Sequence, residues 1–220
     1  MKRQSILVFI KKLHRAVFTT HELAATSGKS LSVVTQALNS LEKQGLVFKI
    51  RRGIWAEAEN ERLSPYQLIP FLFPRHRAYV SFISALHLHG IIEQIPQMIT
   101  LASTAHTRVI QTTMGTFSIH RITPQFFDGF SWYKGTGDFL IAEPEKAVVD
   151  SLYLSACRKK QFGYFPELHF PKGFKMQKMR TWAKRIPDSK ISCYVQKKLE
   201  ILLDKTKDEQ REAKRTRSAY

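Results

Sequence analysis

Cysteine is scarce in this chain, and its scarcity excludes two classes of small protein. The 220 residues include only two cysteines, Cys157 and Cys193, which lie far apart and form no Cys-x-x-Cys pair. A disulfide-rich secreted scaffold and a zinc site built on cysteine pairs both need more cysteines than this. We expect two reduced, partly buried thiols, and the sequence alone leaves a disulfide between them open.

Long apolar runs are also absent. No stretch approaches roughly 18 uninterrupted apolar residues, which is the length of a membrane-spanning helix. Residues 6–10 resemble the core of a signal peptide, but Lys11 and Lys12 end the run before the usual length of roughly 7–15 residues. We therefore expect a soluble, cytoplasmic protein without a membrane partner.

The short motifs of several common enzyme classes are missing as well. The sequence has no His-Glu-x-x-His zinc motif, no phosphate-binding Gly-x-x-x-x-Gly-Lys loop and no Gly-x-Ser-x-Gly nucleophile turn. His87 and His89 are two residues apart in a predicted helix, so they point to different faces and form no metal site. We expect no catalytic residue, no bound metal and no cofactor.

One group of charged residues does invite an enzymatic interpretation. Glu143 and Glu145 precede Lys146, and Lys146 shares a helix face with Asp150. The pattern favours acids that cap a helix, followed by a surface ion pair. The sequence does not fit a nuclease motif of the Asp…(Asp/Glu)-x-Lys type. That motif needs an acidic residue two positions before the lysine, and Pro144 stands there.

Acidic side chains are greatly outnumbered by basic ones. The chain has 35 Lys and Arg against 18 Asp and Glu, which gives a formal net charge of +17 and a pI near 10.0. Such a charge favours an anionic partner, which can be a nucleic acid, a membrane surface or an acidic protein. The apolar fraction of 43% is ordinary for a globular protein with a packed core.

The N-terminal region contains the ordered signals of a winged helix-turn-helix. Thr19 and Glu22 have the spacing of a capping box at the start of a short helix, and Gly28 can end that helix in a left-handed turn. Ser30 can cap a longer helix that ends at Gly45. A helix at the very N-terminus, with an apolar stripe on one side, would complete the domain.

A two-stranded hairpin follows these helices. Residues 46–50 and 54–56 predict the strands, and the turn between them carries Arg51 and Arg52. Such a hairpin is typical of a wing whose cationic tip meets phosphates or the minor groove. We expect Trp55 to pack beneath this wing.

The longer helix has an apolar face and a polar face. Leu31, Val34, Leu38 and Leu41 form one stripe directed at the core. The polar outer face favours DNA as the partner, although a winged helix that binds protein, or a wing that only packs, remains an alternative. The residues predicted to contact DNA are Lys29, Ser30, Ser32, Val33, Gln36, Asn39, Ser40, Lys43, Arg51 and Arg52.

The rest of the chain predicts a second domain, so the expected fold class is α+β: a winged helix-turn-helix followed by a small sheet flanked by helices. Ser64-Pro65 has the form of a helix start, which places the first domain at residues 1–63 and the second at 64–205. Residues 206–220 form a charged tail that is either a fraying helix extension or disordered. The expected elements are helices at 64–73, 81–89, 143–154 and 177–206 and strands at 98–102, 108–112, 115–122 and 139–142.

Three segments in a fixed order give the chain a family resemblance. They are residues 79–90 (YVSFISALHLHG), 115–122 (GTFSIHRI) and 141–153 (IAEPEKAVVDSLY), and they follow the winged region. This order resembles the AbiEi family of antitoxins and autorepressors, which belong to bacterial type IV toxin–antitoxin systems linked to phage defence. The resemblance covers most of residues 5–205.

The resemblance implies a function that composition does not show. Members of the family bind inverted repeats upstream of their own operon, two copies per operator, and repress transcription. They also counteract a toxin that resembles a nucleotidyltransferase, and the family does not imply a stable contact with that toxin. The resemblance also implies that the second domain is the antitoxin domain.

Two other hypotheses stay open at this point. The chain can be a plain winged-helix regulator whose second domain dimerises or senses a signal, or an enzyme that acts on a toxin or a nucleic acid. The densest positive charge lies in residues 158–190, where aromatic residues are interleaved with the lysines and arginines. This segment is either an anion-binding antitoxin surface, with Lys172, Lys175 and Lys178 as its candidates, or the solvated face of helices.

Overall fold

The computed structural model describes residues 4–61, 63–135, 138–157 and 166–217, and its fold is mixed α+β with two separate sheets. Clusters of contacting residues divide the chain into two compact units. The first comprises Met1–Arg77, Ile110–Thr116 and Tyr133–Phe139. The second comprises Ala78–Val109, Phe117–Trp132 and Leu140–Tyr220.

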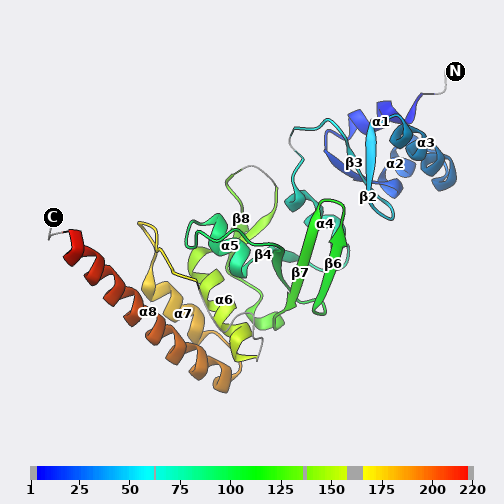
Figure 1. The fold of residues 1–220 in the computed structure, drawn as a ribbon. Coiled ribbons are helices and arrows are strands. Elements are labelled where there is room, and N and C mark those ends of the chain that lie inside the picture. The colour runs from blue at the N-terminus through cyan, green and yellow to red at the C-terminus, as the bar shows by residue number, and fades with distance from the viewer. Residues whose placement is uncertain (1–3, 62, 136–137, 158–165, 218–220) are drawn as a thin grey trace. The chain divides into compact units, whose positions relative to one another are not determined.

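In the first unit, residues 4–61 form three helices and a three-stranded antiparallel sheet (Figure 1). The strands lie in the order β1-β3-β2. β2 and β3 form a hairpin, and β1 pairs with β3, the second strand of that hairpin. Two short helical turns, η1 (Pro65–Leu68) and α4 (Ile69–Leu72), occupy the place of the helix expected at residues 64–73. The preceding elements are α1 (Ile6–Lys12), β1 (Val17–Thr19), α2 (Thr20–Ser27), α3 (Leu31–Lys43), β2 (Val47–Arg51) and β3 (Ile54–Glu57).

One apolar core holds these elements together. Side chains from α1, α2, α3 and the three strands meet there, and Phe18, Leu23, Val34 and Leu38 are fully shielded from solvent. Burial of each large apolar side chain contributes about 1.5–3 kcal/mol, so these contacts are a main source of the stability of residues 4–61. The expectation for Leu31 was wrong: its side chain is 43% exposed, because the first residue of α3 lies at the edge of the stripe.

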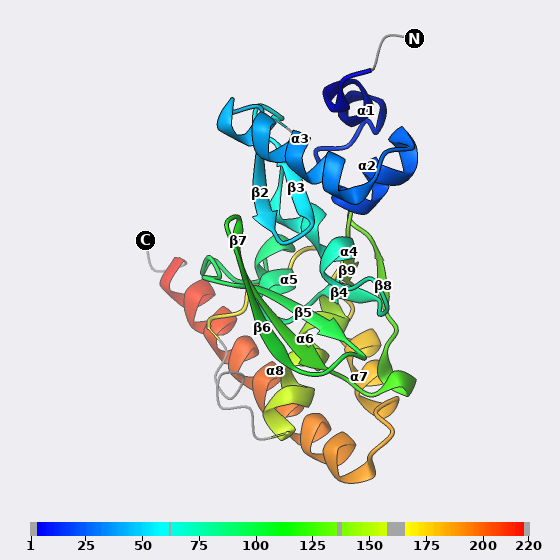
Figure 2. The ribbon, with the colours of Figure 1, turned by 90° about the vertical axis from the view of Figure 1, so that its right-hand side faces the viewer.

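Most strands of a six-stranded mixed sheet, with the order β6-β7-β5-β4-β9-β8, belong to the second unit, whereas residues 110–112 of β6 belong to the first. Figure 2 shows β5, β6 and β7 side by side in this sheet. Parallel pairing joins β4 to β9 and β5 to β7, whereas β4–β5 and β8–β9 are antiparallel. The strands are β4 (Ala78–Val80), β5 (Ile99–Ser103), β6 (Arg108–Thr112), β7 (Gly115–Arg121), β8 (Phe130–Trp132) and β9 (Leu140–Ala142).

The helices of this unit centre on one buried helix. α6 packs against α5, α7 and α8 (Figure 1). Ten consecutive side chains from Glu145 to Leu154 are buried. α6 is therefore surrounded by protein instead of lying on the surface with one apolar face. The helices are α5 (Phe82–Leu88), α6 (Pro144–Ala156), α7 (Met176–Lys184) and α8 (Ser189–Arg217), with a short turn η2 (Pro124–Phe126).

Three expectations about the rest of the chain now have outcomes. Helix α8 continues to Arg217, so the helical alternative for the charged tail holds for residues 206–217. Cys157 and Cys193 are both free, as predicted, but both are exposed, so the prediction of partial burial was wrong. Among the described residues, no helix is both long enough and apolar enough to span a membrane.

Candidate nucleic-acid interface and a buried ion pair

The helix pair α2–α3 is defined by side-chain caps that the sequence predicted. Thr19 Oγ1 accepts the backbone N–H of Glu22 at 3.1 Å, and a Glu22 carboxylate oxygen accepts the N–H of Thr19 at 2.8 Å. Gly28, with φ +66°, makes the left-handed turn between the helices, where a side chain would be strained. Ser30 then caps α3 through the N–H of Val33. These caps fix where α3 begins and which way it faces.

α3 presents two chemically different faces. Val34 and Leu38 are completely buried, whereas Ser32, Gln36, Asn39, Ser40 and Lys43 on the other side are exposed. At 100° per residue, Ser32, Gln36, Asn39 and Lys43 lie opposite the buried stripe. Val33, beside them, is 49% exposed, which leaves one aliphatic side chain at the border of a polar face.

The predicted contact residues differ in whether they already have an intramolecular role. Lys29 Nζ donates to the carbonyl oxygen of Gln4 at 2.8 Å, Ser30 caps α3, and Ser40 accepts from the Gln44 amide at 3.3 Å. Within the described part of the chain, four side chains on the outer face have no side-chain hydrogen bond or ion pair. These uncommitted residues, called the free face of α3 below, are Ser32, Gln36, Asn39 and Lys43.

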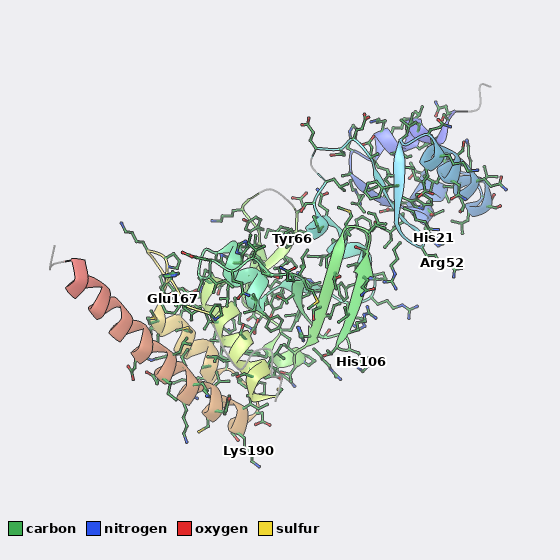
Figure 3. All side chains as sticks on the ribbon, viewed as in Figure 1. His21, Arg52, Tyr66, His106, Glu167 and Lys190 are labelled. Carbon is green, nitrogen blue, oxygen red and sulfur yellow. The ribbon has the colours of Figure 1, made fainter. Side chains whose placement is uncertain are left out.

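The hairpin β2–β3 places two arginines at an exposed tip. Arg51 and Arg52 are both exposed, and Gly53 turns the chain with φ +79°. The carbonyl oxygen of Gly53 accepts the N–H of Thr20 at 3.1 Å, so the tip is attached to the start of α2. Figure 3 accordingly shows the side chains of His21 and Arg52 at the same end of the first unit.

Trp55 packs beneath the hairpin, as predicted. Its side chain is 1% exposed, and its indole N–H donates to Thr20 Oγ1 at 3.1 Å. Lys49 covers the outer side of the ring, with Nζ 5.6 Å from the ring centroid. A buried aromatic anchor and a backbone bond therefore hold the hairpin in place.

Three acidic side chains of this unit already have intramolecular partners. Glu42 accepts the backbone N–H of Lys49 at 3.1 Å, and Glu22 pairs with Arg15 at 3.4 Å. Glu57 accepts a hydrogen bond from Lys11, which lowers the pKa of the Glu57 carboxyl. The unpaired charge on the free face and at the hairpin tip is thus positive.

The second unit contains a charged pair that is completely shielded from solvent. Lys146 and Asp150, one turn apart on α6, form a direct ion pair, and both side chains are 0% exposed. Asp150 Oδ2 accepts two further hydrogen bonds, from the Tyr79 hydroxyl at 3.0 Å and from the Ser81 hydroxyl at 2.8 Å. The expectation of a surface ion pair was therefore wrong, because helices surround α6 where an outer face was expected.

Aromatic rings enclose the lysine of this pair. Nζ of Lys146 lies 3.7 Å from the ring centroid of Phe126 and 5.5 Å from that of Trp182, and it donates to the Tyr79 hydroxyl at 3.2 Å. Burial lowers the pKa of Lys146 and raises that of the Tyr79 hydroxyl. The pair connects strand β4 with helices α6 and α7, so its contacts are those of a structural element in the core.

The two glutamates before this lysine also differ from their predicted role. Glu143 occupies the N-cap position of α6 but makes no capping hydrogen bond, and its carboxylate pairs with Lys178 at 2.9 Å. Glu145 is buried and accepts the backbone N–H of Lys175 at 2.8 Å. These acids therefore attach the start of α7 to the start of α6 instead of capping α6.

The candidate antitoxin surface is only partly free. Residues 158–165, which begin the basic segment, lie outside the described residues. Lys172 and Lys175 are exposed, whereas Lys178 is partly buried beside Glu143. Trp182 of the same segment belongs to the core, so the aromatic residues there do not form one exposed stripe.

The described residues include no group of three or more His, Cys, Asp or Glu side chains arranged to hold a metal ion. A shallow cavity of about 540 Å³ lies at the turn between α7 and α8, bordered by Lys184 and Lys197. Its lining includes Lys184, Ile186, Pro187 and Ser189, at the C-terminal end of the basic segment 158–190, but not Lys172, Lys175 or Lys178. In comparisons with known proteins, no family model matches the chain, and no curated protein matches it.

Proposed function

We propose that residues 4–61 fold as a winged helix-turn-helix and that the chain binds double-stranded DNA in a sequence-specific way. The free face of α3 carries the proposal, because the amides of Gln36 and Asn39 have no side-chain hydrogen bond to any described residue. Helix α3 would enter the major groove, and the hairpin would reach the adjacent backbone. The formal charge of +17 supports an anionic partner.

The polarity of α3 favours DNA over a protein partner. The centre of a protein-docking face is usually apolar and aromatic, but the residues opposite the buried stripe of α3 are Ser32, Gln36, Asn39 and Lys43. Exposed Val33 lies beside that line and not at its centre. Winged helices that dock on proteins are thus the weaker explanation of this surface.

The hairpin gives a direct test of this docking. Replacing Arg51 and Arg52 with Ala should weaken binding to specific and random DNA alike, because phosphate contacts carry no sequence information. The slope of log K against log salt should become flatter by up to about two units, at about 0.9 per neutralised phosphate. Fluorescence anisotropy titrations between low and physiological salt measure both quantities.

A matched variant removes the same charge elsewhere. Lys184→Ala with Lys190→Ala takes two exposed cations from the second unit and should leave the salt slope near that of the parent. If both double variants lower the slope equally, the effect is one of net charge and the hairpin does not touch DNA. If neither does, the hairpin lies away from the duplex.

We further propose that the chain is an autorepressor and antitoxin of the AbiEi type. The resemblance of residues 79–90, 115–122 and 141–153 to that family supports this part. The operator would be an inverted repeat upstream of the protein's own coding sequence, occupied by two copies. The functional partner would be a nucleotidyltransferase-like toxin, which need not be bound directly. Expression of the neighbouring toxin gene with and without this chain tests the antitoxin role.

Charge reversal tests whether the basic segment takes part. Lys172→Glu with Lys175→Glu changes two exposed side chains and should abolish rescue from the toxin while repression of a promoter reporter persists. Lys178 is left unchanged, since a glutamate there would face Glu143. Reversal of Lys197 and Lys198, two exposed lysines of α8 outside the basic segment, is the control. Full rescue by the folded Lys172/Lys175 variant would make this surface a solvated face only.

A further inference from the structure

We infer that the free face of α3 reads A·T base pairs, with Gln36 and Asn39 at adenine and Val33 against the methyl group of thymine. This inference rests on the proposed function, since it names the sequence class that the proposed DNA site recognises. Three observations support it: the face carries two amides and an exposed valine, it has no arginine, and the nearby Lys29 already donates a hydrogen bond within the chain.

The two amides are suited to adenine. In the major groove, Asn and Gln pair bidentately with N6 and N7 of adenine, whereas guanine is read mainly by Arg or Lys. Gln36 and Asn39 are exposed, three residues apart and on adjacent turns of one face. Among the described residues, no side-chain bond holds either amide, so both can turn toward a base edge.

Groups that would read guanine are absent from most of this face. α3 contains no arginine, and its one basic residue, Lys43, stands in the last turn. Residues near the N-terminus of a recognition helix make the base contacts. Lys29, which precedes the helix, is engaged with the carbonyl of Gln4. A guanine contact from the first turns would therefore have no donor of the usual kind.

An exposed aliphatic group supplies the other half of an A·T contact. Val33 is 49% exposed, although valine normally gains by burial. It lies three residues before Gln36, so a groove that admits the glutamine also brings the valine near a base. Thymine alone presents a methyl group in the major groove, and apolar side chains contact it. On the core side Val34 and Leu38 are fully buried, whereas Leu31, at the start of the helix, is exposed like Val33 but lies at the edge of the buried stripe.

The test uses base analogues with the full-length chain. A preferred site is first selected from random duplex DNA, and the positions protected by α3 are expected to be A·T-rich. Each thymidine there is then replaced by deoxyuridine, which removes only the methyl group. Each adenine is replaced by 7-deazaadenine, which removes only the N7 acceptor. Binding is measured by fluorescence anisotropy at one fixed salt concentration.

The inference predicts, for each variant, which base analogue no longer changes the affinity for DNA. One deoxyuridine should weaken binding of the parent about fourfold, the value of one buried methyl group, and should not weaken binding of Val33→Ala. One 7-deazaadenine should weaken the parent by about tenfold, and Gln36→Ala or Asn39→Ala should lose that sensitivity. Val109→Ala and Gln111→Ala change exposed residues of the same types on β6 and should respond to the analogues like the parent.

The outcomes separate this inference from the proposed function. Selection of a defined site with G·C pairs at the α3 positions, or indifference to both analogues, overturns the inference and leaves specific DNA binding standing. Sensitivity that persists in all three variants of α3 also overturns it, because the bases are then read by other residues. Failure to select any site overturns the inference together with the proposed function.

Discussion

Replacing Asp150 with Ala is expected to destabilise the chain by about 3–5 kcal/mol, because it leaves the Lys146 ammonium buried without its counter-charge. Tyr79 and Ser81 also lose their shared acceptor in this variant. Lys146→Met should cost a similar amount, since a carboxylate then stays buried without a cation. Urea unfolding followed by circular dichroism gives the free energy of unfolding of each variant.

A double variant tests whether loss of the Lys146–Asp150 ion pair causes the destabilisation of the single variants. The double variant Lys146→Met with Asp150→Asn should be more stable than the sum of the single changes predicts, by about 0.5–3 kcal/mol. Lys178→Met removes a partly exposed partner of Glu143 and should cost only about 0–1 kcal/mol. Additive effects, or equal costs for Lys146→Met and Lys178→Met, would contradict a tightly coupled buried pair.

The Asp150→Asn variant should also depend on pH in a defined direction. Burial lowers the pKa of Lys146 in the folded state below its ordinary value of 10.5, and Asp150 opposes that shift. Without the carboxylate, the unfolded chain binds more protons than the folded chain over a wider range below pH 10.5, so stability rises with pH there. The deficit of Asp150→Asn relative to the parent should therefore shrink from pH 7 toward pH 10.

The second large effect is expected at the proposed DNA interface. Replacing Gln36 and Asn39 with Ala should lower the ratio of specific to random DNA affinity, since each bidentate amide–adenine pair contributes about 1–3 kcal/mol of discrimination. Affinity for random DNA should change little, because phosphate contacts supply it. Competition gel-shift titrations measure the ratio directly.

An equivalent change elsewhere controls for loss of amide groups. Gln94 and Gln97 are exposed glutamines of the second unit, and their replacement with Ala should leave the ratio unchanged. An unaltered ratio in the Gln36/Asn39 variant would show that α3 does not read bases. A ratio lowered equally in both variants would point to a general effect on folding, which thermal unfolding would reveal.

The elements of the first unit could be predicted because their signals are local. Thr19, Glu22, Gly28 and Ser30 act within a few residues of their own position, and the structure places each cap as predicted. Strand β1 escaped prediction because its three residues become a strand only by pairing with β3, far along the chain. The exposure of the Leu31 side chain was not predicted for a similar reason, since it depends on the residues of other elements that pack around it.

The candidate site in the second unit shows where sequence reasoning fails. A lysine and an aspartate four residues apart predict a surface pair on an ordinary helix, but α6 is enclosed by α5, α7 and α8. Strands β4 and β8, which frame this region, have only three residues each and carry little periodic signal. The available clue was composition, because Lys146 and Asp150 interrupt a run that is otherwise mostly apolar.

The central claim is sequence-specific DNA binding by this chain, and one ratio tests it most directly. The affinity of the full-length protein for the DNA upstream of its own coding sequence is compared with its affinity for a shuffled duplex of the same composition, at physiological salt. The account predicts a preference of at least about 10³-fold, as is typical of specific DNA-binding proteins. Equal affinity for the two duplexes, with the same salt slope, would contradict it.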